Sequence, residues 1–85
     1  MSFRITTNDD GNVTTIRVEG RLGIEAVPEL RREFQLAGNS VRFDLSGLTS
    51  ADADGVRELL ELSDKGAGLC GLSAYIRQML SEASG

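Results

Sequence analysis

Apolar and polar residues alternate near the start of the chain, which is typical of β-strands. Phe3 and Ile5 share one side of a first predicted strand, and Ile16 and Val18 share one side of a second. Between them lies segment 8–12, which is rich in Asn, Asp and Gly and therefore favours a turn. This part of the chain is predicted to form a β-hairpin.

Three later segments have the spacing of an amphipathic helix, in which apolar residues recur at intervals of three and four. They predict helices over about 26–37, over about 54–65 and from Ala74 onward, the last with Ser73 as its cap. Pro28 suits the first turn of the first helix, and Gly38 suits its end. We therefore expect three helices after the hairpin.

Two more strands are predicted between these helices. Val41, Phe43 and Leu45 alternate with polar residues, and 69–72 is a short apolar run. The predicted order is ββαβαβα, an α/β fold whose crossover connections give parallel strands beside an antiparallel hairpin. The polar face of the third strand indicates that the helices cover mainly one face of the mixed four-stranded sheet. One domain is expected over 1–85.

The composition narrows the function. The chain has no histidine, which removes the usual general base and the commonest zinc ligand, so we expect no enzyme and no cofactor. Nine basic and thirteen acidic residues give a net charge of −4, which argues against nucleic acid as a partner. A single cysteine, Cys70, excludes a disulfide framework, and no apolar run approaches the roughly 20 residues that span a bilayer. We expect a cytoplasmic protein that does not insert into membranes.

The most informative segment is 43–56, where an alternating strand leads through a short acidic loop into a helix. Asp52 and Asp54 lie where the positive end of the helix dipole can stabilise charge. With Ser50 as the first position, they and Glu61 have the spacing of a calcium-binding loop, although the element before them is a strand. A metal-binding or acid–base site that uses Asp52, Asp54 and Asp44 is thus one alternative.

Three segments resemble the STAS domain of anti-sigma factor antagonists. The family's Asp-Ser-Ser/Ala-Gly motif corresponds to Asp52-Ala53-Asp54-Gly55, which opens the predicted helix. The other two segments are Val18-Glu19-Gly20-Arg21-Leu22 before Pro28-Glu29-Leu30, and Gly71-Leu72-Ser73 before 75–80. The resemblance implies a STAS fold and a protein-binding switch. In such domains a partner kinase phosphorylates the serine after the motif Asp, and the unphosphorylated domain binds that partner and frees a sigma factor.

This sequence departs from the motif at the switch position. Ala53 occupies the place of the phosphorylated serine, and Gly23 stands where the family often has Asp. Ala53 predicts either constitutive binding or, through Asp52 and Asp54, a fixed negative charge that imitates the phosphorylated state. An Asp carries one charge whereas phosphoserine carries about two, so constitutive binding is the favoured interpretation.

We therefore predict a non-enzymatic regulatory module that binds a protein partner. The predicted partner is an anti-sigma factor with serine kinase activity. The alternative is a membrane (lipid) transporter, which the domain serves as an accessory subunit. A homodimer that covers an open sheet edge is a further expectation. Two of the predicted partner-binding residues, Thr49 and Ser50, are also alternative phosphorylation sites, because each has the hydroxyl group that Ala53 lacks. The predicted partner-binding residues are Thr49, Ser50, Asp52, Ala53, Asp54, Gly55 and Val56.

Overall fold

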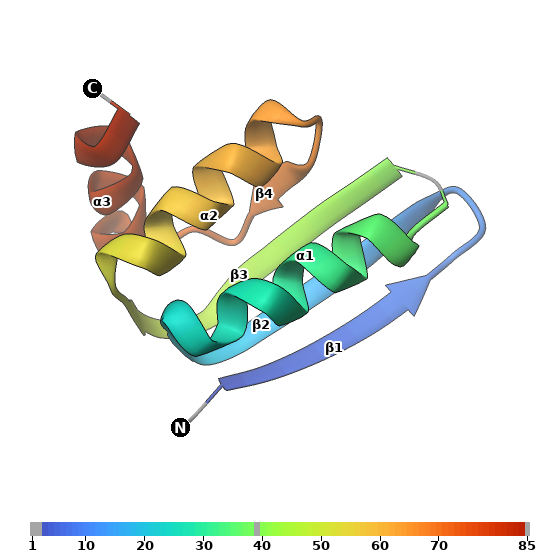
Figure 1. The fold of residues 1–85 in the computed structure, drawn as a ribbon, viewed down its shortest axis with the longest axis horizontal. Coiled ribbons are helices and arrows are strands. Elements are labelled where there is room, and N and C mark those ends of the chain that lie inside the picture. The colour runs from blue at the N-terminus through green and yellow to red at the C-terminus, as the bar shows by residue number, and fades with distance from the viewer. Residues whose placement is uncertain (1–2, 39, 85) are drawn as a thin grey trace.

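The computed structural model describes residues 3–38 and 40–84, and its elements follow the order ββαβαβα predicted from the sequence (Figure 1). A short 3₁₀ helix, which the sequence pattern did not predict, precedes the first α-helix. The elements are β1 (Phe3–Asp9), β2 (Val13–Leu22), the 3₁₀ helix η1 (Ile24–Ala26), α1 (Val27–Leu36), β3 (Ser40–Ala51), α2 (Ala53–Asp64), β4 (Gly68–Cys70) and α3 (Ala74–Ser84).

The four strands form one mixed sheet in the order β1-β2-β3-β4. β1 and β2 pair antiparallel, as a hairpin must, whereas β3 pairs parallel to β2 and β4 pairs parallel to β3. Each parallel pair is connected through a helix, which is the connection that parallel strands require. The predicted mixed sheet is thus confirmed, and β1 and β4 form its two edges.

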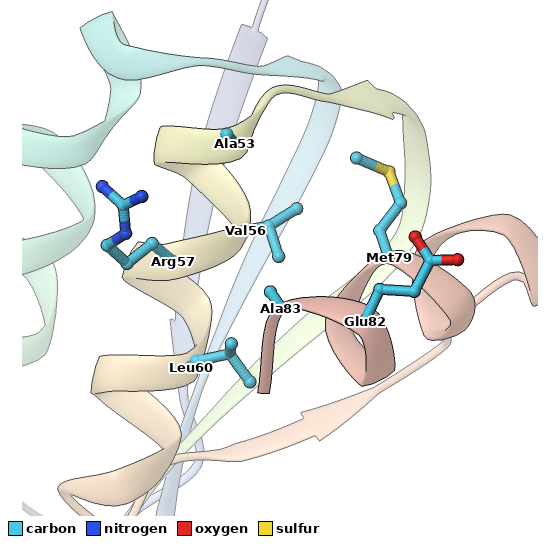
Figure 2. Close-up of a pocket in the computed structure, with 7 residues that line it drawn as sticks. All are labelled: Ala53, Val56, Arg57, Leu60, Met79, Glu82 and Ala83. Carbon is cyan, nitrogen blue, oxygen red and sulfur yellow. The ribbon is translucent and has the colours of Figure 1, made fainter. Parts of the chain in front are cut away.

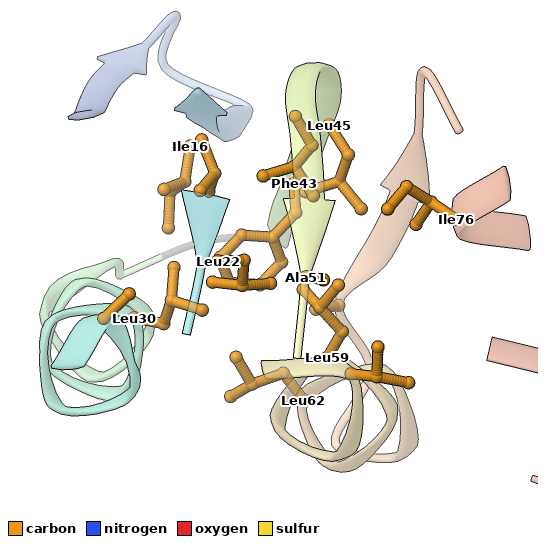
Figure 3. Close-up of a cluster of buried hydrophobic side chains, with 14 of the residues drawn as sticks. Ile16, Leu22, Leu30, Phe43, Leu45, Ala51, Leu59, Leu62 and Ile76 are labelled. Atoms are coloured by element: carbon orange, nitrogen blue, oxygen red, sulfur yellow. The ribbon is translucent and has the colours of Figure 1, made fainter. Parts of the chain in front are cut away.

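The hydrophobic core lies between the sheet and one layer of helices. α1 and α2 lie across the same face of the sheet, and α3 packs against α2 near β4 (Figure 1). Figure 3 shows Leu30 of α1 and Leu59 of α2 pointing toward the strands, while Ile76 enters from α3. These side chains and Phe43 of β3 are at most 1% exposed. The opposite face of the sheet carries polar side chains such as Arg17 and Glu19, whose charged groups are 3.5 Å apart.

β3 is longer than predicted. A loop from Thr49 to Val56 is predicted from the sequence, but β3 continues to Ala51 and pairs with the end of β2. At two register shifts β3 has one more residue than the β2 segment it pairs with, and Leu48 and Ala51 stay buried. Gly47 lies within the strand and does not end it. A Cβ there would lie 2.7 Å from Cγ of Glu19 on β2.

Candidate functional site

The junction between β3 and α2 consists of one residue, Asp52. Its backbone is extended, with φ −96° and ψ 179°, and its side chain is the N-cap of α2. Oδ1 of Asp52 accepts a hydrogen bond from the backbone N–H of Gly55 at 2.9 Å. The backbone N–H of Asp52 donates to the carbonyl of Leu22 at 3.0 Å. Asp52 therefore ties the start of α2 to the end of β2.

Gly55 lets α2 approach the sheet more closely than another residue would. A Cβ at this position would lie 2.6 Å from the carbonyl oxygen of Leu22 and 2.7 Å from its Cγ. Gly55 is buried, and Val56 beside it is only 2% exposed. Of the predicted partner-binding residues, these two therefore face the interior at the start of α2.

Ala53 and Asp54 face solvent in the first turn of α2. Oδ1 of Asp54 lies 3.6 Å from Nη1 of Arg57, one turn further along the helix. Both side chains of this ion pair are about half exposed or more, so the attraction between them is weak. The predicted switch position is thus an exposed methyl group beside a partly compensated carboxylate.

Thr49 and Ser50 belong to β3 and are separated from the exposed first turn of α2 by Ala51 and Asp52. The hydroxyl of Thr49 donates to the carbonyl of Gly20 at 3.1 Å. Ser50 is half-buried and pairs with Arg21 of β2. Their immediate role is therefore to hold β3 against β2.

The geometry does not favour the metal-binding alternative. In residues 3–38 and 40–84, no three His, Cys, Asp or Glu side chains gather to hold an ion. Val56 to Glu61 lie within α2, so they cannot wrap around an ion as a calcium-binding loop does. Asp44 stabilises the backbone next to it, because its Oδ1 accepts a hydrogen bond from the backbone N–H of Ser46 at 3.0 Å. That hydrogen bond, more than any other interaction, lowers the pKa of Asp44 below its ordinary value of 3.8.

A hollow of about 360 Å³ opens next to Ala53, between α2 and α3 (Figure 2). Its apolar side chains come from both helices, and Figure 2 shows Val56 and Ala83 facing each other across it. Sequence reasoning missed the α3 side of this hollow, because the amphipathic spacing of α3 does not say which helix it packs against. The lining residues are Ala53, Val56, Arg57, Leu60, Met79, Glu82 and Ala83.

A smaller hollow of about 190 Å³ lies on the other side of Arg57, between α1 and α2. Ile24 of η1 borders it and is 61% exposed. At its base the buried carboxylate of Glu58 accepts a hydrogen bond from Nε of Arg31 at 3.0 Å. Glu58 raises the pKa of Arg31 through this bond. The side chain of Arg57 therefore borders both hollows, which lie on either side of α2.

The mixed sheet, the helices on one face and the acidic strand-to-helix junction together define a small α/β module. The family model described as Mlab, STAS domain, matches residues 5–83, and the chain therefore belongs to the STAS domain family. The predicted resemblance to the STAS domain of anti-sigma factor antagonists is confirmed. A search of curated proteins found no match.

Two solved structures illustrate the relationship. The anti-sigma factor antagonist SpoIIAA in its unphosphorylated form is 21% identical, with a TM-score of 0.68 over 94% of this chain and 82% of that one. An antisigma-factor antagonist STAS domain from Rhodobacter sphaeroides is 28% identical, with a TM-score of 0.59 over 81% of this chain and 86% of that one. The predicted STAS fold is thus confirmed, and antagonists of this fold are regulatory modules that bind protein partners.

A third structure extends the comparison beyond the named antagonists. A protein from Shewanella loihica with a SpoIIAA-like fold is 16% identical, with a TM-score of 0.56 over 86% of this chain and 70% of that one. At this identity the likeness concerns the fold alone.

None of the helices in the described part of the chain has both the length and the apolar character needed to cross a bilayer.

Proposed function

We propose that this STAS domain is a non-enzymatic module that binds a regulatory protein through the start of α2. The surface centres on the exposed Ala53 and Asp54, with Val56 beneath them. Asp52 and Gly55 support this surface from below, because they fix α2 against β2. Thr49 and Ser50 support it from the end of β3.

The observation that carries the proposal is the position of Ala53. It is the first residue of α2, it is exposed, and it follows the N-cap aspartate directly. In the family motif this place holds the phosphorylated serine, whose added charge would meet the partner at the helix N-terminus. Alanine cannot accept phosphate. Binding is therefore constitutive with respect to this position.

The charge at Asp54 supports constitutive binding over permanent imitation of a phosphoserine. Asp54 carries a single charge, and Arg57 lies 3.6 Å from it. A phosphoserine would add about two negative charges and three acceptor oxygens in the same turn. The unmodified surface is therefore closer in charge to the unphosphorylated state of a switching relative.

The proposed partner is an anti-sigma factor with serine kinase activity. Binding of the purified domain to such a protein, encoded near it in the genome, is measured by calorimetry with and without ATP. We expect equal affinity in both conditions for the wild type. Ala53→Ser is expected to bind without ATP and to lose affinity once ATP permits phosphorylation.

A matched pair of substitutions tests where the partner docks. Ala53→Glu adds one negative charge to the first residue of α2, and Ala74→Glu adds the same charge to the first residue of α3, which is also exposed. We expect Ala53→Glu to weaken the complex by roughly 1–3 kcal/mol, because its charged side chain loses water at an apolar surface when the partner binds, and Ala74→Glu to leave the affinity unchanged. If Ala53→Glu and Ala74→Glu both bind the partner as tightly as the wild type does, the start of α2 is not the interface.

The alternative proposal is an accessory subunit of a membrane transporter. The same variants apply, with an ATP-binding cassette protein encoded nearby as the partner. A stable complex with that protein, and none with a kinase, would assign the domain to the transporter.

A further inference from the structure

We infer that the hollow between α2 and α3 receives an amphipathic helix of the protein partner, with apolar side chains inside it and a basic side chain at Glu82. This inference rests on the proposed function, since it places part of that interface on α3.

The hollow has an apolar floor built from two helices. Ala53, Val56 and Leu60 are spaced by three and four residues and therefore follow one side of α2 for about 10 Å. Met79 and Ala83 are spaced by four residues on α3 and form the opposite wall. The floor runs directly from the exposed methyl of Ala53, so a partner docked at the start of α2 covers the hollow as well.

A helix is the occupant that this geometry fits best. The walls are the sides of two helices, whose backbone N–H and C=O groups bond within the helix away from its ends, so no strand edge is offered to an extended peptide. The lining contains no aromatic residue, whereas proline-rich segments dock in aromatic-lined grooves. Side chains at positions i and i+4 of a partner helix have the spacing of the apolar strip on α2.

The charges at the rim favour a basic residue on the partner. Arg57, the cation that borders the hollow, is paired with Asp54 at 3.6 Å. Glu82 on the opposite rim accepts a hydrogen bond from the neutral amide of Gln78 at 3.2 Å. Within the described part of the chain, no cationic group lies within 4.0 Å of Glu82. A lysine or arginine of the partner would form an ion pair with the carboxylate of Glu82.

Photo-cross-linking in cells of the native organism tests the location. The photoreactive amino acid p-benzoylphenylalanine replaces Ala83 in the hollow, Asp54 at the start of α2, or Thr6 on the uncovered sheet face. Ala83 and Asp54 are exposed, so the fold tolerates the replacements. We expect Ala83 and Asp54 to cross-link one protein and Thr6 none. Mass spectrometry should place the Ala83 cross-link in a helical segment with apolar and basic residues.

Charge reversal tests the basic contact in the purified complex with the cross-linked protein. Glu82→Lys should weaken binding about tenfold, because it places like charges together. Asp64→Lys makes the same charge change at the exposed end of α2, outside the hollow, and should alter binding less than about threefold. Circular dichroism melting of both variants confirms that each remains folded.

The outcomes separate this inference from the proposed function. If Asp54 cross-links a protein and Ala83 does not, the start of α2 is an interface and the helix in the hollow is wrong. If neither position cross-links a protein, both proposals are wrong. Cross-links from Ala83 to lipid or to a second copy of this chain would overturn the inference, as would equal binding by Glu82→Lys and Asp64→Lys.

Discussion

Replacing Gly55 by alanine is the sharpest test of how α2 is seated on the sheet. The added Cβ would lie 2.6 Å from the carbonyl oxygen of Leu22 and 2.7 Å from its Cγ. The first of these atoms belongs to the backbone of β2, which cannot rotate away as a side chain could. Either α2 or the end of β2 must therefore shift, although Asp52 holds the two together.

The size of the effect follows from two opposing contributions. Overpacking a tightly packed site typically costs about 1–3 kcal/mol. Alanine in place of glycine in a helix returns about 1 kcal/mol, because it reduces the conformational freedom of the unfolded chain. With a backbone atom at 2.6 Å we take the upper end of the packing cost, so the net loss is about 1–2 kcal/mol. For a domain of this size, that lowers the melting temperature by roughly 4–16 °C.

Thermal unfolding followed by circular dichroism measures this loss, with Gly38→Ala as the matched control. A Cβ at Gly38 has no atom within 4 Å among those described, so alanine there should leave stability unchanged or raise it by about 0.4–1 kcal/mol. If Gly55→Ala melts at or above the wild-type temperature while Gly38→Ala behaves as expected, the close seating of α2 on β2 is refuted.

Three further predictions concern stability. Asp52→Ala should lose about 1 kcal/mol in urea unfolding because the cap of Gly55 N–H is lost, whereas Asp52→Asn, which keeps the acceptor, should lose less than half as much. Arg31→Ala should lower the urea midpoint, because it leaves the buried carboxylate of Glu58 without its cation, and adding Glu58→Gln should restore part of the loss. The pKa of Asp44 is lowered, so its stabilisation is present above pH 3.8 and is lost as the pH falls through its folded-state pKa. The wild type should therefore have a lower urea midpoint at about pH 2.5 than at about pH 6. In Asp44→Asn this difference should be smaller, because asparagine does not titrate.

The order of the elements could be predicted because hydrophobic periodicity changes clearly from two to three or four along this chain. The end of β3 could not be predicted in the same way. At two register shifts β3 has one extra residue relative to β2, which interrupts the period of two, so Leu48 and Ala51 still lie on the core side. Glycine in this strand signals a close side chain, Glu19, rather than the end of pairing.

The candidate site was only partly accessible to sequence reasoning. The motif places Asp52 and Gly55 at the start of α2, whereas the need for glycine at position 55 comes from Leu22 of β2, which is distant in sequence. The hollow beside Ala53 depends on the angle at which α3 packs on α2, and the second hollow depends on Ile24 of η1. Such features combine elements distant in sequence, and local periodicity carries no information about them.

The one-residue junction at Asp52 also has a consequence for how fast and how tightly a partner can bind. A long flexible loop loses conformational entropy when it is ordered in a complex, at about 1–2 kcal/mol per residue fixed in its backbone. Here the backbone and side chain of Asp52 are already held by hydrogen bonds to Leu22 and Gly55. The surface at Ala53 is therefore preorganised, and its association should proceed as a single kinetic step without a slow ordering phase.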